Sequence, residues 1–176
     1  MTGPEDAGNP PRYAPERGYP PYAFMPGRNP HPREDPGGHS YGAVEDDPEP
    51  VSPADWAECG TYLHGVDLYN AGFLWEAHEA WEALWLASRH DPVQFGFLQG
   101  LIQCSAGALK AELGRAEGLR RLAEEGTAKI AAATSSGPVY MGLDAAAFTA
   151  AYRAWAATKP DSAEARPRIL LEATSR

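Results

Sequence analysis

The distribution of proline divides this chain into two parts with different capacities to fold. Twelve of the 17 prolines lie at or before Pro50, among glycines, arginines and acidic residues and with few aliphatic side chains. A segment of this composition cannot bury enough apolar surface to offset the entropy that it loses on ordering. We therefore expect residues 1–52 to form a disordered, Pro-rich acidic tail, and the packed core to lie downstream of it.

Beyond residue 52 the sequence has the periodicity of helices. Trp56, Cys59, Leu63 and Val66 recur at spacings of three and four residues, and no strand-like alternation occurs before residues 168–171. A second helix is expected at about residues 73–88. Capping and turn residues mark the boundaries of five predicted helices: Ser52 or Asp55, Gly72, Asp91-Pro92, Gly114, Asp144 and Pro160.

Short connections between consecutive helices favour antiparallel neighbours. We therefore expect an all-α fold, a compact bundle of about five helices built from two stacked helical hairpins and a closing helix. This bundle domain should span residues 53–160, with residues 161–176 as a C-terminal extension. A row of small residues on the third helix, which includes Gly100, Cys104 and Ala111, predicts the close approach of a neighbouring helix.

Charge and composition exclude several classes of partner. The formal net charge is −9, so a surface that binds nucleic-acid phosphates is not expected. No run approaches the roughly 20 apolar residues of a membrane span, and the N-terminus lacks the pattern of a secretory signal. Cys59 and Cys104 lie on apolar helix faces without the spacing of a zinc site. We expect a cytoplasmic protein with two reduced core thiols and no contact with a membrane.

The stretch NAGFLWEAHEAWEALWL at residues 70–86 places ionisable side chains in an otherwise apolar helix. On a helical wheel its apolar side chains gather on one face, which we expect to be buried: Leu74, Ala77, Trp81, Leu84 and Trp85. His78 falls within this face, and Glu82 falls on its margin one turn along. Glu76 and Glu79 point away from it, so we expect them to be surface residues.

The pair of His78 and Glu82 is open to three interpretations. In the first, imidazole and carboxylate satisfy each other in a structural polar network that fixes the register of two helices. In the second, Asp67 from the preceding helix joins them as a ligand of iron, manganese or zinc. In the third, Trp81 or Trp85 forms the apolar wall of a pocket for a small molecule or peptide, and His78 orients that ligand.

Three motifs in this region resemble those of the domain of unknown function 309 family, small bacterial and archaeal helical proteins. The motifs are Tyr69-Asn70-Ala71-Gly72, then Glu76-Ala77-His78-Glu79 with Glu82 and Trp85, and Phe97-Leu98-Gln99-Gly100-Leu101-Ile102-Gln103. The HxxxExxW hallmark of the family is met by His78, Glu82 and Trp85. The resemblance covers about residues 67–130 and implies an all-α bundle without an established activity. It also groups several residues as one constellation: Asn70, His78, Glu82, Trp85, Gln99 and Gln103.

Two classes of function follow from these observations. A non-enzymatic binding or scaffolding module fits the hairpin architecture, because the sequence lacks a complete catalytic set such as a nucleophile with its base. The alternative is a metal-binding protein or a metal-dependent enzyme that uses His78, Glu82 and Asp67 with a divalent metal. In either case the partner is an unknown protein or small molecule, and the high aromatic content makes a homodimer a further hypothesis.

Overall fold

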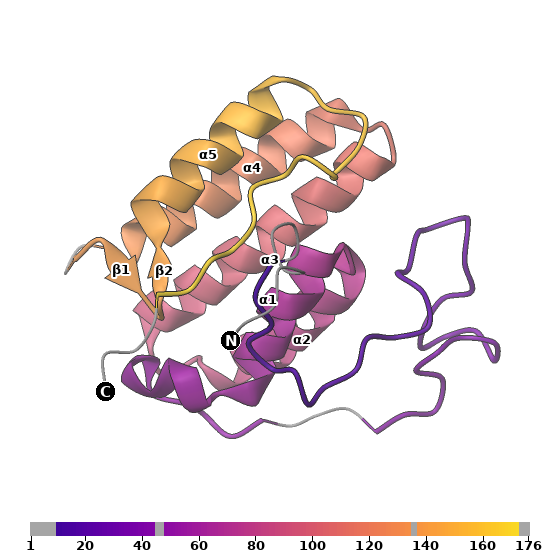
Figure 1. Ribbon diagram of the computed structural model, residues 1–176, viewed down its shortest axis with the longest axis horizontal. Coiled ribbons are helices and arrows are strands. Elements are labelled where there is room, and N and C mark those ends of the chain that lie inside the picture. Colours follow the sequence, from indigo (N-terminus) through magenta and orange to yellow (C-terminus); the bar gives the residue numbers. More distant parts are fainter. Residues whose placement is uncertain (1–9, 45–47, 135–136, 173–176) are drawn as a thin grey trace, which may run out of the picture.

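The helical part of the chain has the predicted architecture. The computed structural model describes residues 10–44, 48–134 and 137–172. Within these residues a short 3₁₀ helix and five α-helices are accompanied by a two-stranded antiparallel hairpin (Figure 1). Their bounds are η1 (Pro53–Glu58), α1 (Gly60–Ala71), α2 (Leu74–Ala87), α3 (Pro92–Glu112), α4 (Ala116–Ala132), β1 (Val139–Tyr140), β2 (Leu143–Asp144) and α5 (Ala145–Ala157).

Predicted capping residues fix several of the helix ends. The carboxylate of Asp91 accepts the N–H groups at the start of α3, and the carboxylate of Asp144 accepts the N–H of Ala147 in α5. Gly72 ends α1 in the left-handed region with φ of 91°, where a side chain would be strained. The expected first helix is in fact two elements, because the backbone leaves the helical region at Cys59 and separates η1 from α1.

The helices stack as two hairpins with a closing helix. The hairpin of α1 and α2 packs through α2 on α3, while α3 pairs with α4, and α5 lies on α4 (Figure 1). Glycine allows the closest of these approaches. A Cβ added to Gly126 on α4 would lie 2.9 Å from the carbonyl oxygen of Gly100 on α3, and one added to Gly100 would lie 2.7 Å from the oxygen of Gly126. The row of small residues therefore does bring two helices together.

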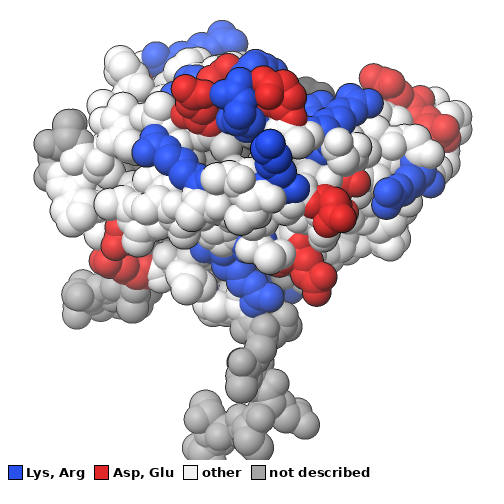
Figure 2. Space-filling model, turned by 90° about the horizontal axis from the view of Figure 1, so that it is seen from above, with Lys and Arg blue, Asp and Glu red and all other residues white. Residues whose placement is uncertain are grey.

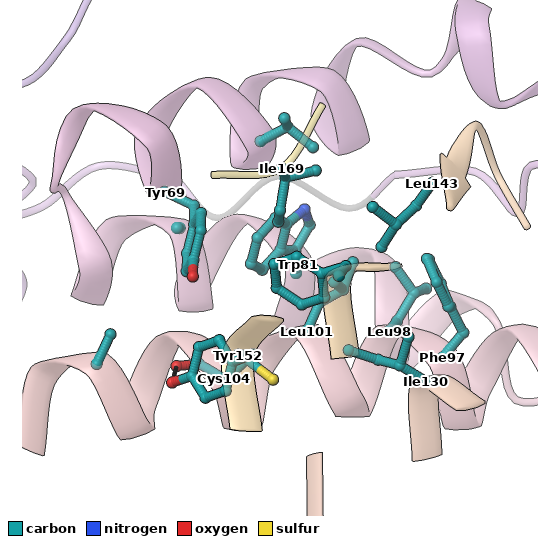
Figure 3. Close-up of a cluster of buried hydrophobic side chains, with 14 of the residues drawn as sticks. Tyr69, Trp81, Phe97, Leu98, Leu101, Cys104, Ile130, Leu143, Tyr152 and Ile169 are labelled. Atoms are coloured by element: carbon teal, nitrogen blue, oxygen red, sulfur yellow. Dashed lines mark hydrogen bonds between the residues drawn. The ribbon is translucent and has the colours of Figure 1, made fainter. Parts of the chain in front are cut away.

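Trp81 lies at the centre of the core that these helices share. The side chain is fully buried, and its Nε1 donates to the carbonyl oxygen of Tyr62, 3.3 Å away. The labelled side chains around it in Figure 3 come from every helix of the bundle except η1 and from the segments that follow α4 and α5. Burial of a large side chain of this kind contributes roughly 2–3 kcal/mol.

The segment after α5 returns across the bundle and completes the end of α1. The side-chain amide of Asn70 donates to the carbonyl oxygen of Ile169 and accepts the N–H of the same residue, both at 2.8 Å. The guanidinium of Arg166 donates to the carbonyl oxygens of Tyr69 and Asn70 in the last turn of α1, where carbonyl groups have no N–H partner within the helix. Residues 161–172, expected to be an extension, therefore add buried side chains such as Ile169 to the core (Figure 1).

The N-terminal residues differ most from expectation. Residues 10–44, which we call the N-terminal segment, begin in front of the α1–α2 hairpin and continue as a loop beside it (Figure 1). Ala14 and Phe24 of this segment are buried. The sequence predicts a disordered tail for this range, whereas the structure describes it as packed on the helices; residues 1–9 and 45–47 lie outside the described residues. Two buried carboxylates explain the difference, because Asp67 and Glu76 accept backbone N–H groups of the segment. Side-chain acceptors thus replace the regular backbone pairing that prolines prevent.

Replacing Asp67 by Ala should release the first part of the N-terminal segment. Its oxygens accept from the N–H groups of Tyr13 and Ala14 at 2.8 and 2.9 Å and from Arg12 Nε at 3.0 Å. Loss of these acceptors should lower the free energy of unfolding by about 1–3 kcal/mol and accelerate proteolysis within residues 10–44. Asp55→Ala, which removes an exposed carboxylate, is the control. Equal proteolysis of the two variants would contradict the described anchor.

The contact between α3 and α4 can be tested with two glycines. Gly126→Ala should lower the free energy of unfolding by about 1–3 kcal/mol, because the new methyl group would meet a backbone oxygen. Gly96→Ala is the matched control, since a Cβ at Gly96 has no neighbour within 4 Å. It should leave the stability unchanged or raise it by up to about 1 kcal/mol through helix propensity. Chemical denaturation measures both, and equal stabilities would refute the close approach.

Candidate functional site

The outward side of α2 carries the ligand-type side chains that the sequence singled out. His78 Nε2 lies 3.7 Å from Glu82 Oε2, and the two side chains are 30% and 41% exposed. His78 is therefore less buried than the helical wheel predicts. The reason is that the buried face of α2 runs along Leu74, Ala77 and Trp81, which leaves His78 on the neighbouring, partly exposed stripe.

Glu79, and not Asp67, lies close to His78 and Glu82. Among the described residues, one group of at least three His, Cys, Asp or Glu side chains could share an ion, and it consists of His78, Glu79 and Glu82, with one ligand atom of each within 4.8 Å of the others. Asp67 is 1% exposed and is not part of this group. Its carboxylate instead accepts from the N-terminal segment, so the predicted set of Asp67, His78 and Glu82 is not brought together.

The two tryptophans proposed as a pocket wall have other roles. Trp81 is fully buried in the core, so it cannot line a pocket. Trp85 is half-buried and stacks on Phe95 of α3, with ring centroids 4.6 Å apart. The hallmark tryptophan therefore contributes to the junction of α2 and α3.

Two of the remaining members of the predicted constellation, Gln103 and Asn70, bond to other elements of the fold. Gln103 bonds to α4, where its Nε2 donates to Glu125 at 2.8 Å and its Oε1 accepts from Lys129 at 3.0 Å. Asn70 holds the C-terminal segment, as described above. Gln99 is half-buried on α3. The glutamine and asparagine side chains with assigned bonds thus connect elements of the fold.

Glu76, expected at the surface, is one of the buried charged groups. Its Oε1 accepts the N–H of Phe24 at 2.8 Å and lies 3.0 Å from Nε2 of His39. The side chains of His39 and Glu76 are only 4% and 5% exposed. The wheel placed Glu76 correctly on the side of α2 that faces away from the bundle. The N-terminal segment covers that side, which the sequence pattern of α2 alone does not reveal.

A groove runs between the N-terminal segment and the α1–α2 hairpin. Its volume is about 940 Å³, and both polar and apolar groups line it. The sequence did not predict it, because one wall belongs to the segment that was expected to be disordered. Six of its lining side chains are charged or titratable: Arg17, Arg33, His64, Glu79, Glu82 and Arg89.

His64 forms part of the groove wall and is half-buried. Burial, and next the positive charge of Arg17, lower the pKa of His64 from its usual value. The imidazole is therefore neutral at pH 7. Its Nδ1 is buried and has no hydrogen-bond partner among the described residues, although buried polar atoms nearly always have one.

One of the comparisons with known proteins gives a match, to a protein family. Residues 62–122 match the family described as Domain of unknown function (DUF309). This part of the chain, about a third of its length, is similar to that family. The match confirms the resemblance seen in the sequence and covers most of α1 through the first part of α4. No curated protein and no solved structure matches the chain.

The DUF309 match divides the groove into two parts. His64, Glu79, Glu82 and Arg89 fall within residues 62–122, whereas Arg17 and the rest of the N-terminal segment lie outside them. One wall of the groove thus belongs largely to the residues that match the family, and the other is supplied by the segment in front of them.

Other surfaces of the protein have a different character. On the side of α4 and α5, basic and acidic side chains are interspersed (Figure 2). On α4 itself, Arg120 pairs with Glu117 and Glu124, and Arg121 pairs with Glu125. Of the helices that the structure describes, none is long and apolar enough to cross a membrane.

Proposed function

We propose that the protein is a helical binding module that holds a small molecule in the groove between the N-terminal segment and the α1–α2 hairpin. The observation that carries this proposal is the groove itself. Its volume of about 940 Å³ falls within the range of about 300–1,000 Å³ that small-molecule sites occupy. Charged side chains on both walls offer the few polar contacts with which such sites orient a ligand.

The proposal does not include catalysis at the groove. Ser40 Oγ lies 2.8 Å from His39 Nδ1, and the other ring nitrogen of His39 faces Glu76, which is the order of groups in a serine hydrolase. Acyl transfer also needs N–H donors for the developing oxyanion. The N–H groups of Ser40 and Tyr41 already donate to carbonyl oxygens of the segment. We therefore interpret this chain of hydrogen bonds as a structural tie.

Filling the groove tests this function. Ala83 lines the groove, so Ala83→Trp should occupy part of it and abolish ligand binding. We expect some members of a panel of neutral, cationic and anionic small molecules to raise the melting temperature of the wild-type protein. At a ligand concentration of 100 times Kd, binding stabilises the folded state by about 2.7 kcal/mol. The same compounds should have no effect on Ala83→Trp.

The matched control is Ala128→Trp, which adds the same side chain at an exposed position of α4. This variant should respond to the compounds as the wild-type protein does. A ligand that stabilises Ala83→Trp as strongly as Ala128→Trp binds elsewhere, and that result would refute the groove as the binding site.

A second candidate function is the binding of a divalent metal ion by the outward side of α2. The observation in its favour is the group of His78, Glu79 and Glu82, whose ligand atoms lie within 4.8 Å of one another. One imidazole and two carboxylates suit first-row metals such as zinc, manganese or iron. All three side chains are partly exposed, so water could complete the coordination. Arg33 Nε lies 3.1 Å from one oxygen of Glu79 and would compete with the ion.

His78→Ala tests the metal site directly. Isothermal titration with zinc or manganese should give one site per chain in the wild-type protein and none in His78→Ala. The control is His90→Ala, which removes an exposed imidazole outside the group and should retain the site. If the two histidine variants bind the ion equally, or the wild-type protein does not bind it, the metal function is wrong.

A further inference from the structure

The charges in the groove are unevenly matched. Arg33 and Glu79 face each other, with Nε 3.1 Å from Oε2. Glu82 has His78 at 3.7 Å as its neighbour. Each acidic side chain of the groove therefore lies beside a basic side chain other than Arg17 or Arg89. The groove is lined by two further cations, Arg17 and Arg89.

Arg17 and Arg89 have no ion-pair partner within the part of the chain that the structure describes. They line the groove in a protein whose formal net charge is −9, where acidic partners are plentiful. A guanidinium that faces a concave surface in this way is suited to bind an oxyanion, because its N–H groups match the geometry of carboxylate and phosphate.

The two arginines reach the groove from different elements. Arg89 lies just beyond α2, next to its C-terminal capping residue. Arg17 belongs to the N-terminal segment, and its carbonyl oxygen accepts from the guanidinium of Arg12, which also binds Asp67. The anchor at Asp67 therefore positions the backbone from which Arg17 projects. A ligand bound by both arginines would connect the N-terminal segment to the C-terminal end of α2.

His64 adds a polar group of another kind to the same wall. It is close enough to Arg17 for that charge to act on its ionisation, and its ring is neutral at pH 7. No described residue bonds its Nδ1, so the protein does not fix the ring in one tautomer. The side chain can thus adjust as donor or acceptor to a polar ligand beside the arginines.

We infer that the groove takes a small molecule carrying a phosphate or carboxylate group, which Arg17 and Arg89 bind from opposite walls beside His64. This inference rests on the proposed function, since it names the ligand class for the same groove. It also implies a conformational effect. Because the ligand bridges the N-terminal segment and α2, its binding protects residues 10–44 from proteolysis.

Binding of inorganic phosphate and of citrate to the full chain tests the inference. Isothermal titration at constant ionic strength should detect at least one of the two probes, and their comparison tells a phosphate site from a carboxylate site. Arg17→Gln and Arg89→Gln should each weaken binding of that probe by about tenfold, which corresponds to about 1.4 kcal/mol. Arg28→Gln removes an exposed arginine of the same segment that does not line the groove, and should bind as the wild-type protein does.

Proteolysis provides a second readout for the same proteins. The bound probe should slow cleavage within residues 10–44 in the wild-type protein and in Arg28→Gln, and should do so much less in the two groove variants. Absence of binding by the wild-type protein, or equal affinity of Arg17→Gln, Arg89→Gln and Arg28→Gln, would overturn the inference. If neutral or cationic molecules bind instead and Ala83→Trp abolishes that binding, the groove function holds and the oxyanion assignment alone is wrong.

Discussion

The candidate groove depends on two buried carboxylates that accept backbone N–H groups from the N-terminal segment. Asp67 on α1 binds residues 12–14, and Glu76 on α2 binds Phe24 and His39. A buried carboxylate without such donors would cost several kcal/mol, so the helices and the segment stabilise each other. Without this mutual requirement the outward side of the α1–α2 hairpin would face solvent, and the groove would lose one of its walls.

Hydrogen bonds at two carboxylates cannot by themselves order a long segment, because each fixed residue costs about 1–2 kcal/mol of backbone entropy. Aromatic contacts supply further stabilisation. Tyr19 stacks on Phe73 with centroids 5.0 Å apart, and Phe24 and His31 both pack edge-to-face on Trp75. Proline also helps, since it restricts the unfolded chain and so reduces the entropy lost on folding. The proline-rich composition that suggested disorder thus reduces the entropy that the segment loses when it packs on the helices.

The sequence predicted the helical bundle well because its signals are local. Asp91 and Asp144 cap helices, Gly72 ends one, and small residues at Gly100 and Gly126 allow close packing. The hairpin of β1 and β2 and the break at Cys59 were missed, since each involves only a few residues without a periodic pattern.

The candidate site was harder to predict because its contacts join residues that lie 37 to 55 positions apart in the sequence. The wheel correctly turned Glu76 and Glu79 away from the bundle, but nothing in α2 shows that Phe24, His39 and Arg33 meet them there. Asp67 was correctly singled out as a polar residue beside the core. Backbone N–H groups, which have no sequence signature, bind its carboxylate, and it lies outside the group of His78, Glu79 and Glu82.

The most direct test of this account is hydrogen exchange at the amides of Tyr13, Ala14 and Phe24, whose N–H groups donate to Asp67 and Glu76. The account predicts that these three amides exchange far more slowly than they would in an unstructured chain, and that Asp67→Ala removes the protection of the first two. Exchange of all three at the rate of an unstructured peptide would show that the segment does not lie on the helices, and the groove would then have no second wall.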